Sequence, residues 1–163
     1  MNGVAITLRA LYDGERRLEH DLLAAAERHR ADHEVHHVAT DVARWSHEHA
    51  RRLAHAAPRY GLDLPGAEDD AAPGRWEALW ERTAEALGRR PGSGLLLLHD
   101  LRHLHLAATE NSLRWEELAQ VAQATGDTRL LHLATSCHPQ TLRQLRWTNA
   151  VLKTLSPHLL SSL

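Results

Sequence analysis

The chain lacks phenylalanine and contains little cysteine, methionine or tyrosine. Its 163 residues include no Phe, one Cys, one Met and two Tyr, whereas Ala, Leu, Arg and Glu are plentiful. Aromatic and β-branched residues favour strands, while Ala, Leu, Arg and Glu favour helices. The composition therefore predicts an all-α chain. A chain of this length can bury a substantial core as a single domain.

Other absences exclude whole classes of protein. The single cysteine, Cys137, cannot form a disulfide within the chain, so nothing requires an oxidising compartment. Lys and Arg number 19 against 21 Asp and Glu, and the formal net charge of −2 provides no basic field for nucleic acid or an anionic membrane. The leucine run at 95–98 is too short to span a bilayer, and the first residues lack the pattern of a secretory signal. We expect a cytoplasmic protein.

Apolar residues recur at helical spacing along four long segments. The first covers about residues 7–30, and the second covers 33–60 and ends before Gly61. The third covers about 94–125. The fourth covers 128–155, with Asp127 as its N-cap and Ser156 and Pro157 closing it, so the last residues are expected to form a loose tail.

A long stretch rich in Pro, Gly and Asp separates the second segment from the third. Within it, residues 75–88 carry Trp76 and Trp80 at helical spacing and predict a short helix inside a crossover. The predicted elements are thus two pairs of long helices, each pair joined by a tight turn, with the crossover between the pairs.

This order of elements resembles the ferritin-like superfamily and differs from an up-down bundle with three short loops. The resemblance covers residues 7–156. It implies a ferritin-like, antiparallel four-helix bundle in which residues 1–163 form a single domain and the crossover carries the short helix.

The apolar stripe of each helix identifies the polar residues that face inward with it. Glu15 lies on the stripe of the first helix, with Glu19 at its edge, and the stripe of the second helix includes Ser46 and His49. The third and fourth helices place further polar residues inward: Asn111, Ser112, Thr141 and Gln144, with Cys137 on the same stripe. Because all of them lie near the middle of their helices, we expect a polar layer inside the bundle.

In ferritin-like dimetal proteins such a layer is the active site, built from one Glu on each of two helices and a Glu-x-x-His on each of the other two. The resemblance can be followed position by position. Glu15 matches the glutamate of the first helix. On the second helix, Ser46-x-x-His49 keeps the imidazole and loses the carboxylate.

The other two helices depart further from the dimetal pattern. Asn111 or Ser112 stands in place of a glutamate, and Thr141-x-x-Gln144 stands in place of Glu-x-x-His. Two redox metal ions need several anionic oxygens to offset their charge, whereas this layer supplies one carboxylate and one imidazole. The resemblance therefore implies a degenerate dimetal site.

Two interpretations of Glu15 and His49 remain open. In the first, they form a hydrogen-bonded pair, as buried polar groups usually do, and the protein is a non-catalytic binding or interaction protein with no cofactor and an unknown partner. In the second, they hold one divalent metal ion such as zinc, with Glu19 and Cys137 as candidate additional ligands. The protein would then be a metal-binding protein or a small metalloenzyme.

Two kinds of partner are also predicted. The leucines at 95–98 make the start of the third helix apolar all round, which favours a homodimer. A small apolar ligand between Trp45 and Trp115, beside the polar layer, is the other candidate.

The chain is rich in histidine, with fourteen in all, and an i, i+4 pair on a helix can chelate a divalent ion. However, His29, His33 and His37 fall at the predicted first turn, and a second group faces away from its apolar stripe. That second group, His99-x-x-x-His103, resembles one piece of the hemerythrin-like iron site, whose remaining pieces are missing here. We expect solvated side chains in both groups and at four acidic positions: Asp100, Glu110, Glu116 and Glu117.

Overall fold

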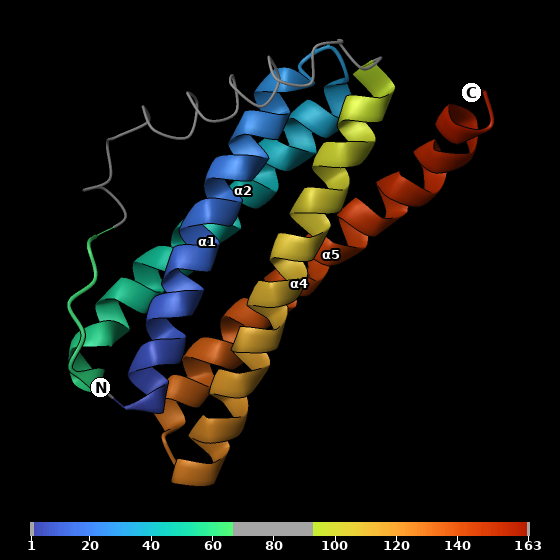
Figure 1. The fold of residues 1–163 in the computed structure, drawn as a ribbon. Helices are drawn as coiled ribbons and strands as arrows, with labels where there is room; N and C mark the ends of the chain where they lie inside the picture. Colours follow the sequence, from blue (N-terminus) through green and yellow to red (C-terminus); the bar gives the residue numbers. More distant parts are fainter. Residues whose placement is uncertain (1, 67–92, 163) are drawn as a thin grey trace.

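The computed structural model describes residues 2–66 and 93–162, and this part of the chain is all-helical, as the composition predicts (Figure 1). Helix α1 spans Gly3–Arg28, and α2 spans His33–Ala56 and is followed by the short 3-10 helix η1, Ala57–Tyr60. Helix α4 spans Ser93–Thr125 and α5 spans Thr128–Leu160. The helix predicted at 75–88, with Trp76 and Trp80, lies outside the described residues.

The four long helices pack side by side as a bundle. Helix α1 lies against α2, and α4 lies against α5 (Figure 1). Helix α1 also packs on α4, and α2 meets α5 over a smaller area. Each helix therefore has two neighbours, and the side chains between them form the interior.

Side-chain caps and glycines set the ends of these helices. Three of the helices begin at a residue whose side-chain oxygen accepts a backbone amide: Asn2 for α1, Asp32 for α2 and Asp127 for α5. Gly61 and Gly126 lie just after η1 and α4 with φ of 75° and 69°, a left-handed conformation that glycine adopts without strain.

Helix α5 continues past its predicted end. The sequence predicts that Ser156 and Pro157 close the helix at residue 155, but the helix runs through both to Leu160, so this prediction is wrong. Proline removes only one hydrogen bond of the helix, and α5 tolerates a second proline in its interior. Leu159 packs directly over Gly94 at the start of α4, where an added Cβ would lie 2.4 Å from the leucine side chain. This contact anchors the last turns of α5.

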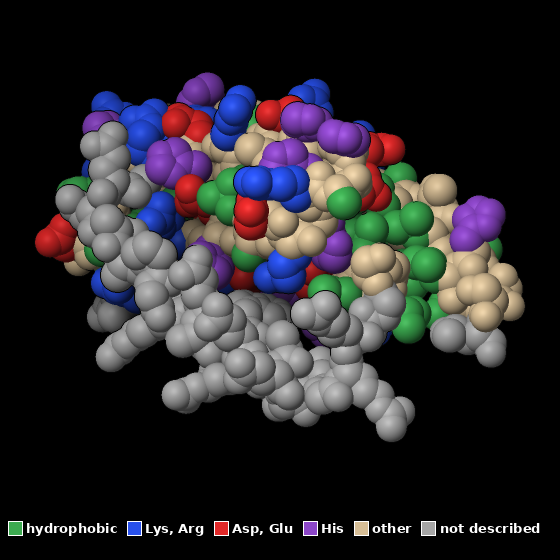
Figure 2. All heavy atoms as spheres, turned by 90° about the horizontal axis from the view of Figure 1, so that it is seen from above, with side chains coloured by type: hydrophobic (Ala, Val, Ile, Leu, Met, Phe, Trp, Pro, Cys, Tyr) green, Lys and Arg blue, Asp and Glu red, His purple; other side chains and the backbone are tan. Residues whose placement is uncertain are grey.

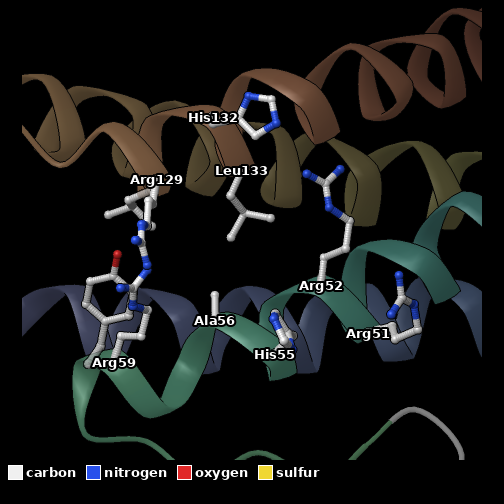
Figure 3. A pocket seen from close by; sticks show the side chains of 10 residues that line it. Arg51, Arg52, His55, Ala56, Arg59, Arg129, His132 and Leu133 are labelled. Atoms are coloured by element: carbon white, nitrogen blue, oxygen red, sulfur yellow. The ribbon is translucent and has the colours of Figure 1, made fainter.

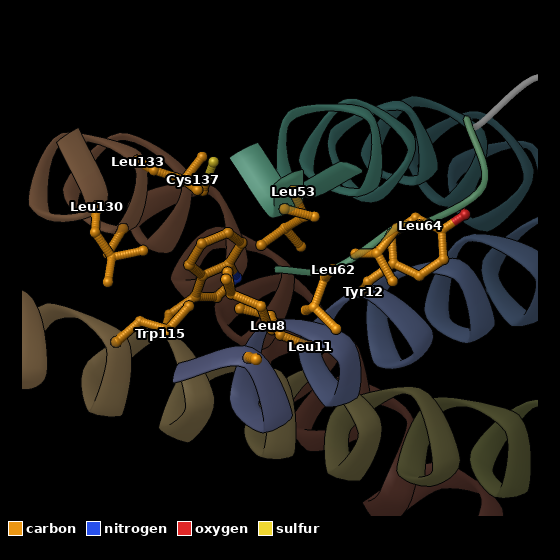
Figure 4. Close-up of a cluster of buried hydrophobic side chains, with 14 of the residues drawn as sticks. Leu8, Leu11, Tyr12, Leu53, Leu62, Leu64, Trp115, Leu130, Leu133 and Cys137 are labelled. Carbon is orange, nitrogen blue, oxygen red and sulfur yellow. The ribbon is translucent and has the colours of Figure 1, made fainter. Parts of the chain in front are cut away.

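Hydrophobic clusters fill the interior along its length. The first surrounds the fully buried Trp115 and includes Leu8, Leu53 and Leu130 (Figure 4). A second gathers Leu18, Leu22, Val42 and Leu104, with Trp45 and Trp147 packed against it. A third joins Val35, Leu97 and Leu101 to the end of α5.

The surface carries charges of both signs. On the face seen in Figure 2, Lys and Arg are interspersed with Asp, Glu and His. None of the described helices is long and apolar enough to cross a membrane. In the leucine run at 95–98, Leu97 and Leu98 are buried and Leu95 and Leu96 are half-buried. The homodimer stays a prediction.

The cap of α5 predicts a measurable contribution to stability. Asp127 accepts the Leu130 amide at 2.9 Å and the Tyr60 hydroxyl at 2.7 Å, and these bonds lower the pKa of Asp127. We expect Asp127→Ala to reduce the free energy of unfolding at pH 7 by about 1–2 kcal/mol, measured by urea denaturation. Because a lowered pKa favours the folded state only while the carboxylate is ionised, the loss should shrink as the pH falls below about 4. Tyr60→Phe is the control, since it removes the hydroxyl and keeps the cap. An Asp127→Ala variant no less stable than Tyr60→Phe would contradict the role of the cap.

Candidate functional site

The best candidate site from the sequence, Glu15 and His49, forms a direct pair in the interior. Both side chains are 0% exposed. The Nδ1 of His49 lies 3.1 Å from Oε1 of Glu15, and its Nε2 lies 2.8 Å from Oε1 of Gln140 on α5. Each ring nitrogen thus has a hydrogen-bonding partner on another helix. The two side chains form a buried, hydrogen-bonded pair.

Trp115 completes the pair from a third direction. Its indole N–H donates to the same Glu15 oxygen at 2.9 Å, and its ring meets the His49 ring edge to face, with centroids 5.6 Å apart. Glu15, His49, Trp115 and Gln140 come from α1, α2, α4 and α5 respectively. A chain of three hydrogen bonds thus joins all four long helices at one level of the bundle.

The two candidate additions to a metal site do not join this pair. Glu19 lies half-buried beside Arg16 at 3.1 Å and His47 at 2.9 Å. Cys137 is fully buried, and burial raises the pKa of its thiol to about 11, which keeps it protonated. Among the described residues, no group of three or more His, Cys, Asp or Glu side chains is placed to hold a metal ion.

The other residues of the predicted polar layer are all buried: Ser46, Asn111, Ser112, Thr141 and Gln144. Gln144 donates to the Val42 carbonyl at 3.0 Å and to the Ser46 hydroxyl at 2.9 Å. Ser112 lies 2.8 Å from Nε2 of His138, and burial lowers the pKa of that histidine. These contacts satisfy part of the layer, whereas Nδ2 of Asn111, Oγ1 of Thr141 and Oε1 of Gln144 are buried and have no hydrogen-bond partner among the described residues.

Glycine at position 14 lets α1 approach α4 at the level of this layer. A Cβ added to Gly14 would lie 2.2 Å from Oδ1 of Asn111. Gly14 has no side chain to block this approach, and the Asn111 amide occupies the space.

A second buried charge cluster lies where the sequence predicts solvated residues. Asp100 is only 3% exposed, and its Oδ2 accepts from Nε2 of His29 at 2.7 Å and from Nε of Arg28 at 3.0 Å. Burial raises the pKa of Asp100, but the hydrogen bonds from His29 and Arg28 outweigh it, so the pKa lies below its ordinary value. The prediction of a solvated Asp100 and of a surface His29 is wrong, because the last turn of α1 folds over the start of α4.

The remaining histidines differ in their surroundings. His33 and His37 are exposed and their rings stack, with centroids 6.3 Å apart, and His99 is exposed as well. His103 is half-buried, and its Nε2 lies 3.0 Å from Oδ2 of the buried Asp21 on α1. The prediction that His103 is a freely solvated side chain is therefore wrong.

Comparisons of the chain with family models, with curated proteins and with solved structures find no match. Inferences about function therefore depend on the geometry described above.

The buried pair predicts energetic coupling between its two residues. We expect Glu15→Ala and His49→Ala each to reduce the free energy of unfolding by about 1–3 kcal/mol or more, because each leaves a buried polar group without its hydrogen-bond partner. The double variant should lose less than the sum of the two, a difference that a double-mutant cycle in urea measures directly.

The control for this cycle is Glu19→Ala, since Glu19 forms the more exposed pair with His47. Its cost should stay near 1 kcal/mol or below. Additive losses for Glu15→Ala and His49→Ala, or losses no larger than the control, would refute the coupling between the two residues.

We expect the contribution of Asp100 to the stability of the fold to depend on pH. Its lowered pKa means that its contribution is complete above about pH 4, the range of an unfolded Asp, and disappears as the pH falls through the folded-state pKa. We expect Asp100→Asn to be less stable than wild type at pH 7 by about 1.5–3 kcal/mol and to match it in strong acid. Glu117→Gln, at an exposed position of α4, should change stability by less than about 0.5 kcal/mol. Thermal unfolding from pH 2 to 7 checks both, and a constant difference for Asp100→Asn would contradict the assignment.

Proposed function

We propose that the protein is a non-catalytic binding or interaction protein on a ferritin-like, antiparallel four-helix bundle whose dimetal site is degenerate. The single observation that carries this proposal is the state of His49. Both of its ring nitrogens are occupied, one by Glu15 and one by Gln140. A metal ligand needs a free nitrogen lone pair. His49, the histidine that matches the dimetal pattern, instead uses both nitrogens to join α2 to its neighbouring helices.

The facing residues of α2 and α5 support the antiparallel arrangement. Hydrogen bonds join Ser46 to Gln144, His49 to Gln140 and Arg52 to Ser136. Residue numbers rise along α2 while they fall along α5. The short connections from α1 to α2 and from α4 to α5, together with the long stretch between η1 and α4, agree with two helical pairs joined by a crossover.

One observation favours a second candidate function, a site for one divalent ion at Glu15 and His49. Oε2 of Glu15 is buried and has no hydrogen-bond partner among the described residues. A cation could use that oxygen if His49 released Gln140 and turned a nitrogen toward it.

Metal analysis distinguishes the two functions. We expect untagged wild-type protein, purified without a metal column, to contain no stoichiometric metal by plasma mass spectrometry and to show no d–d absorption on titration with Co²⁺. Glu15→Gln is the matched variant because it keeps the shape and replaces the metal-binding carboxyl group with an amide, and far-UV circular dichroism verifies that it is folded. About one equivalent of metal in wild type that disappears in Glu15→Gln would overturn the proposal in favour of the metal site.

A further inference from the structure

A cationic cleft opens on the surface between α2 with η1 on one side and the start of α5 on the other (Figure 3). Its volume is about 770 Å³, within the range of about 300–1,000 Å³ that is usual for small-molecule sites. Figure 3 shows Arg59 and Arg129 at one end and Arg52 reaching up toward α5 at the other, with Ala56 and Leu133 between them. The cleft differs from the polar layer because its lining is basic and open to solvent.

The charge in this cleft is not balanced by its own walls. Four arginines and two histidines line it, and no Asp or Glu does. This concentration arises in a chain whose formal net charge is −2. Clustered like charges destabilise a compact fold, so an uncompensated group of guanidinium ions suits an anionic ligand.

The nearest carboxylates are already engaged. Glu48 accepts two hydrogen bonds from Arg51, of 2.8 and 2.6 Å, and so neutralises its charge. Arg51 therefore lines the cleft without adding free positive charge to it. Asp127 accepts the Leu130 amide and the Tyr60 hydroxyl, and these bonds together with the nearby charge of Arg59 lower its pKa, although no ion pair joins Asp127 to Arg59 or Arg129 among the described residues.

Three guanidinium groups therefore lack a carboxylate partner among the described residues. Arg52 donates to the neutral hydroxyl of Ser136 at 2.7 Å. Arg59 and Arg129 form no hydrogen bond or ion pair with any described side chain, and they come from opposite walls of the cleft. Asp127 lies close to the end of the cleft that holds Arg59 and Arg129. A ligand must therefore carry more than one negative charge, or several anionic oxygens, to compete with the Asp127 carboxylate for these two guanidinium groups.

The middle of the cleft is apolar. Leu130 and Leu133 are almost fully buried in the first hydrophobic cluster, and with Ala56 they provide a non-polar surface between the two groups of arginine. A ligand that matches the cleft is thus amphipathic, with an anionic group at one end and an apolar body.

We propose that this cleft binds a small organic phosphate, with Arg59 and Arg129 holding the phosphoryl oxygens and the apolar body lying over Leu133 and Ala56. Guanidinium groups bind phosphate through paired hydrogen bonds. A phosphomonoester also carries more than one negative charge, which lets it compete with the carboxylate of Asp127. A long nucleic acid fits less well, because it needs an extended basic surface and this protein is acidic overall. The inference deepens the proposed binding function by naming the class of ligand.

Calorimetric titration with three probes tests the proposal on the full chain: 1-naphthyl phosphate, inorganic phosphate and the neutral 1-naphthol. We expect 1-naphthyl phosphate to bind most tightly, inorganic phosphate more weakly, and 1-naphthol not measurably. The Arg59→Ala/Arg129→Ala double variant should bind 1-naphthyl phosphate at least about tenfold more weakly, since it loses two charge-assisted contacts.

The matched control is Arg102→Ala/Arg146→Ala, which removes the same charge from exposed positions outside the cleft. It should change the affinity by less than about twofold. Both variants should stay folded, because neither pair supports the core, and thermal unfolding verifies this. The probe should raise the melting temperature of wild type and of the control and leave that of the cleft variant unchanged.

Several results would overturn the proposal. Equal loss of affinity in the control would mean non-specific attraction, and equal binding of 1-naphthol would mean an apolar site. Binding of a single-stranded oligonucleotide that 1-naphthyl phosphate cannot displace would assign the cleft to nucleic acid instead. Absence of binding by all three probes at millimolar concentration would reject the ligand class alone, whereas stoichiometric metal at Glu15 and His49 would reject the proposed function.

Discussion

A buried carboxyl group whose hydrogen bonds must be made inside the protein is the constraint on which this bundle depends. Glu15 has no access to water, and a buried polar group without a hydrogen-bond partner is costly. His49 and Trp115 both bond to Oε1 of Glu15, and Gln140 bonds to the other ring nitrogen of His49. A shift of any one helix by a turn would break this chain and leave a buried polar group unpaired. The network thus selects one register of the four helices among those that hydrophobic contacts alone would permit.

The hydrophobic clusters are arranged around this requirement. The cluster around Trp115 lies on one side of the polar layer, and the cluster containing Leu22 and Leu104 lies on the other. Trp115 belongs to both environments, because its ring packs among leucines and its N–H satisfies Glu15. Gly14 contributes by having no side chain, which lets α1 come close enough to α4 for Asn111 to enter the layer. The ring of Trp115 therefore contributes to the hydrophobic core, while its N–H helps to fix the register of the helices.

Periodicity within single helices is enough to predict Glu15, His49 and the polar layer, because each shares a stripe with large apolar neighbours. The same signal is present for Asp100, which lies three residues after Leu97 and four before Leu104, but the sequence does not show its partners. Arg28 and His29 stand at the end of α1, where the sequence suggests a solvated turn, and no pattern within one helix shows which distant residue will cover it. The end of α5 also depends on a contact between distant residues: Leu159 packs on Gly94, and the helix continues past Pro157.

The interior and the cleft are linked by the seam between α2 and α5. Going along α2 from Ser46 to His49 and Arg52, each residue bonds to a partner on α5, namely Gln144, Gln140 and Ser136 in turn. One turn further, Ala56 faces Leu133, and neither can hydrogen-bond across the gap. A small side chain at this step leaves space between the helices where a larger one would have closed it. The arginines of the cleft lie beside this space, so the same register that pairs the polar groups inside the bundle also leaves positive charge exposed beside an apolar hollow.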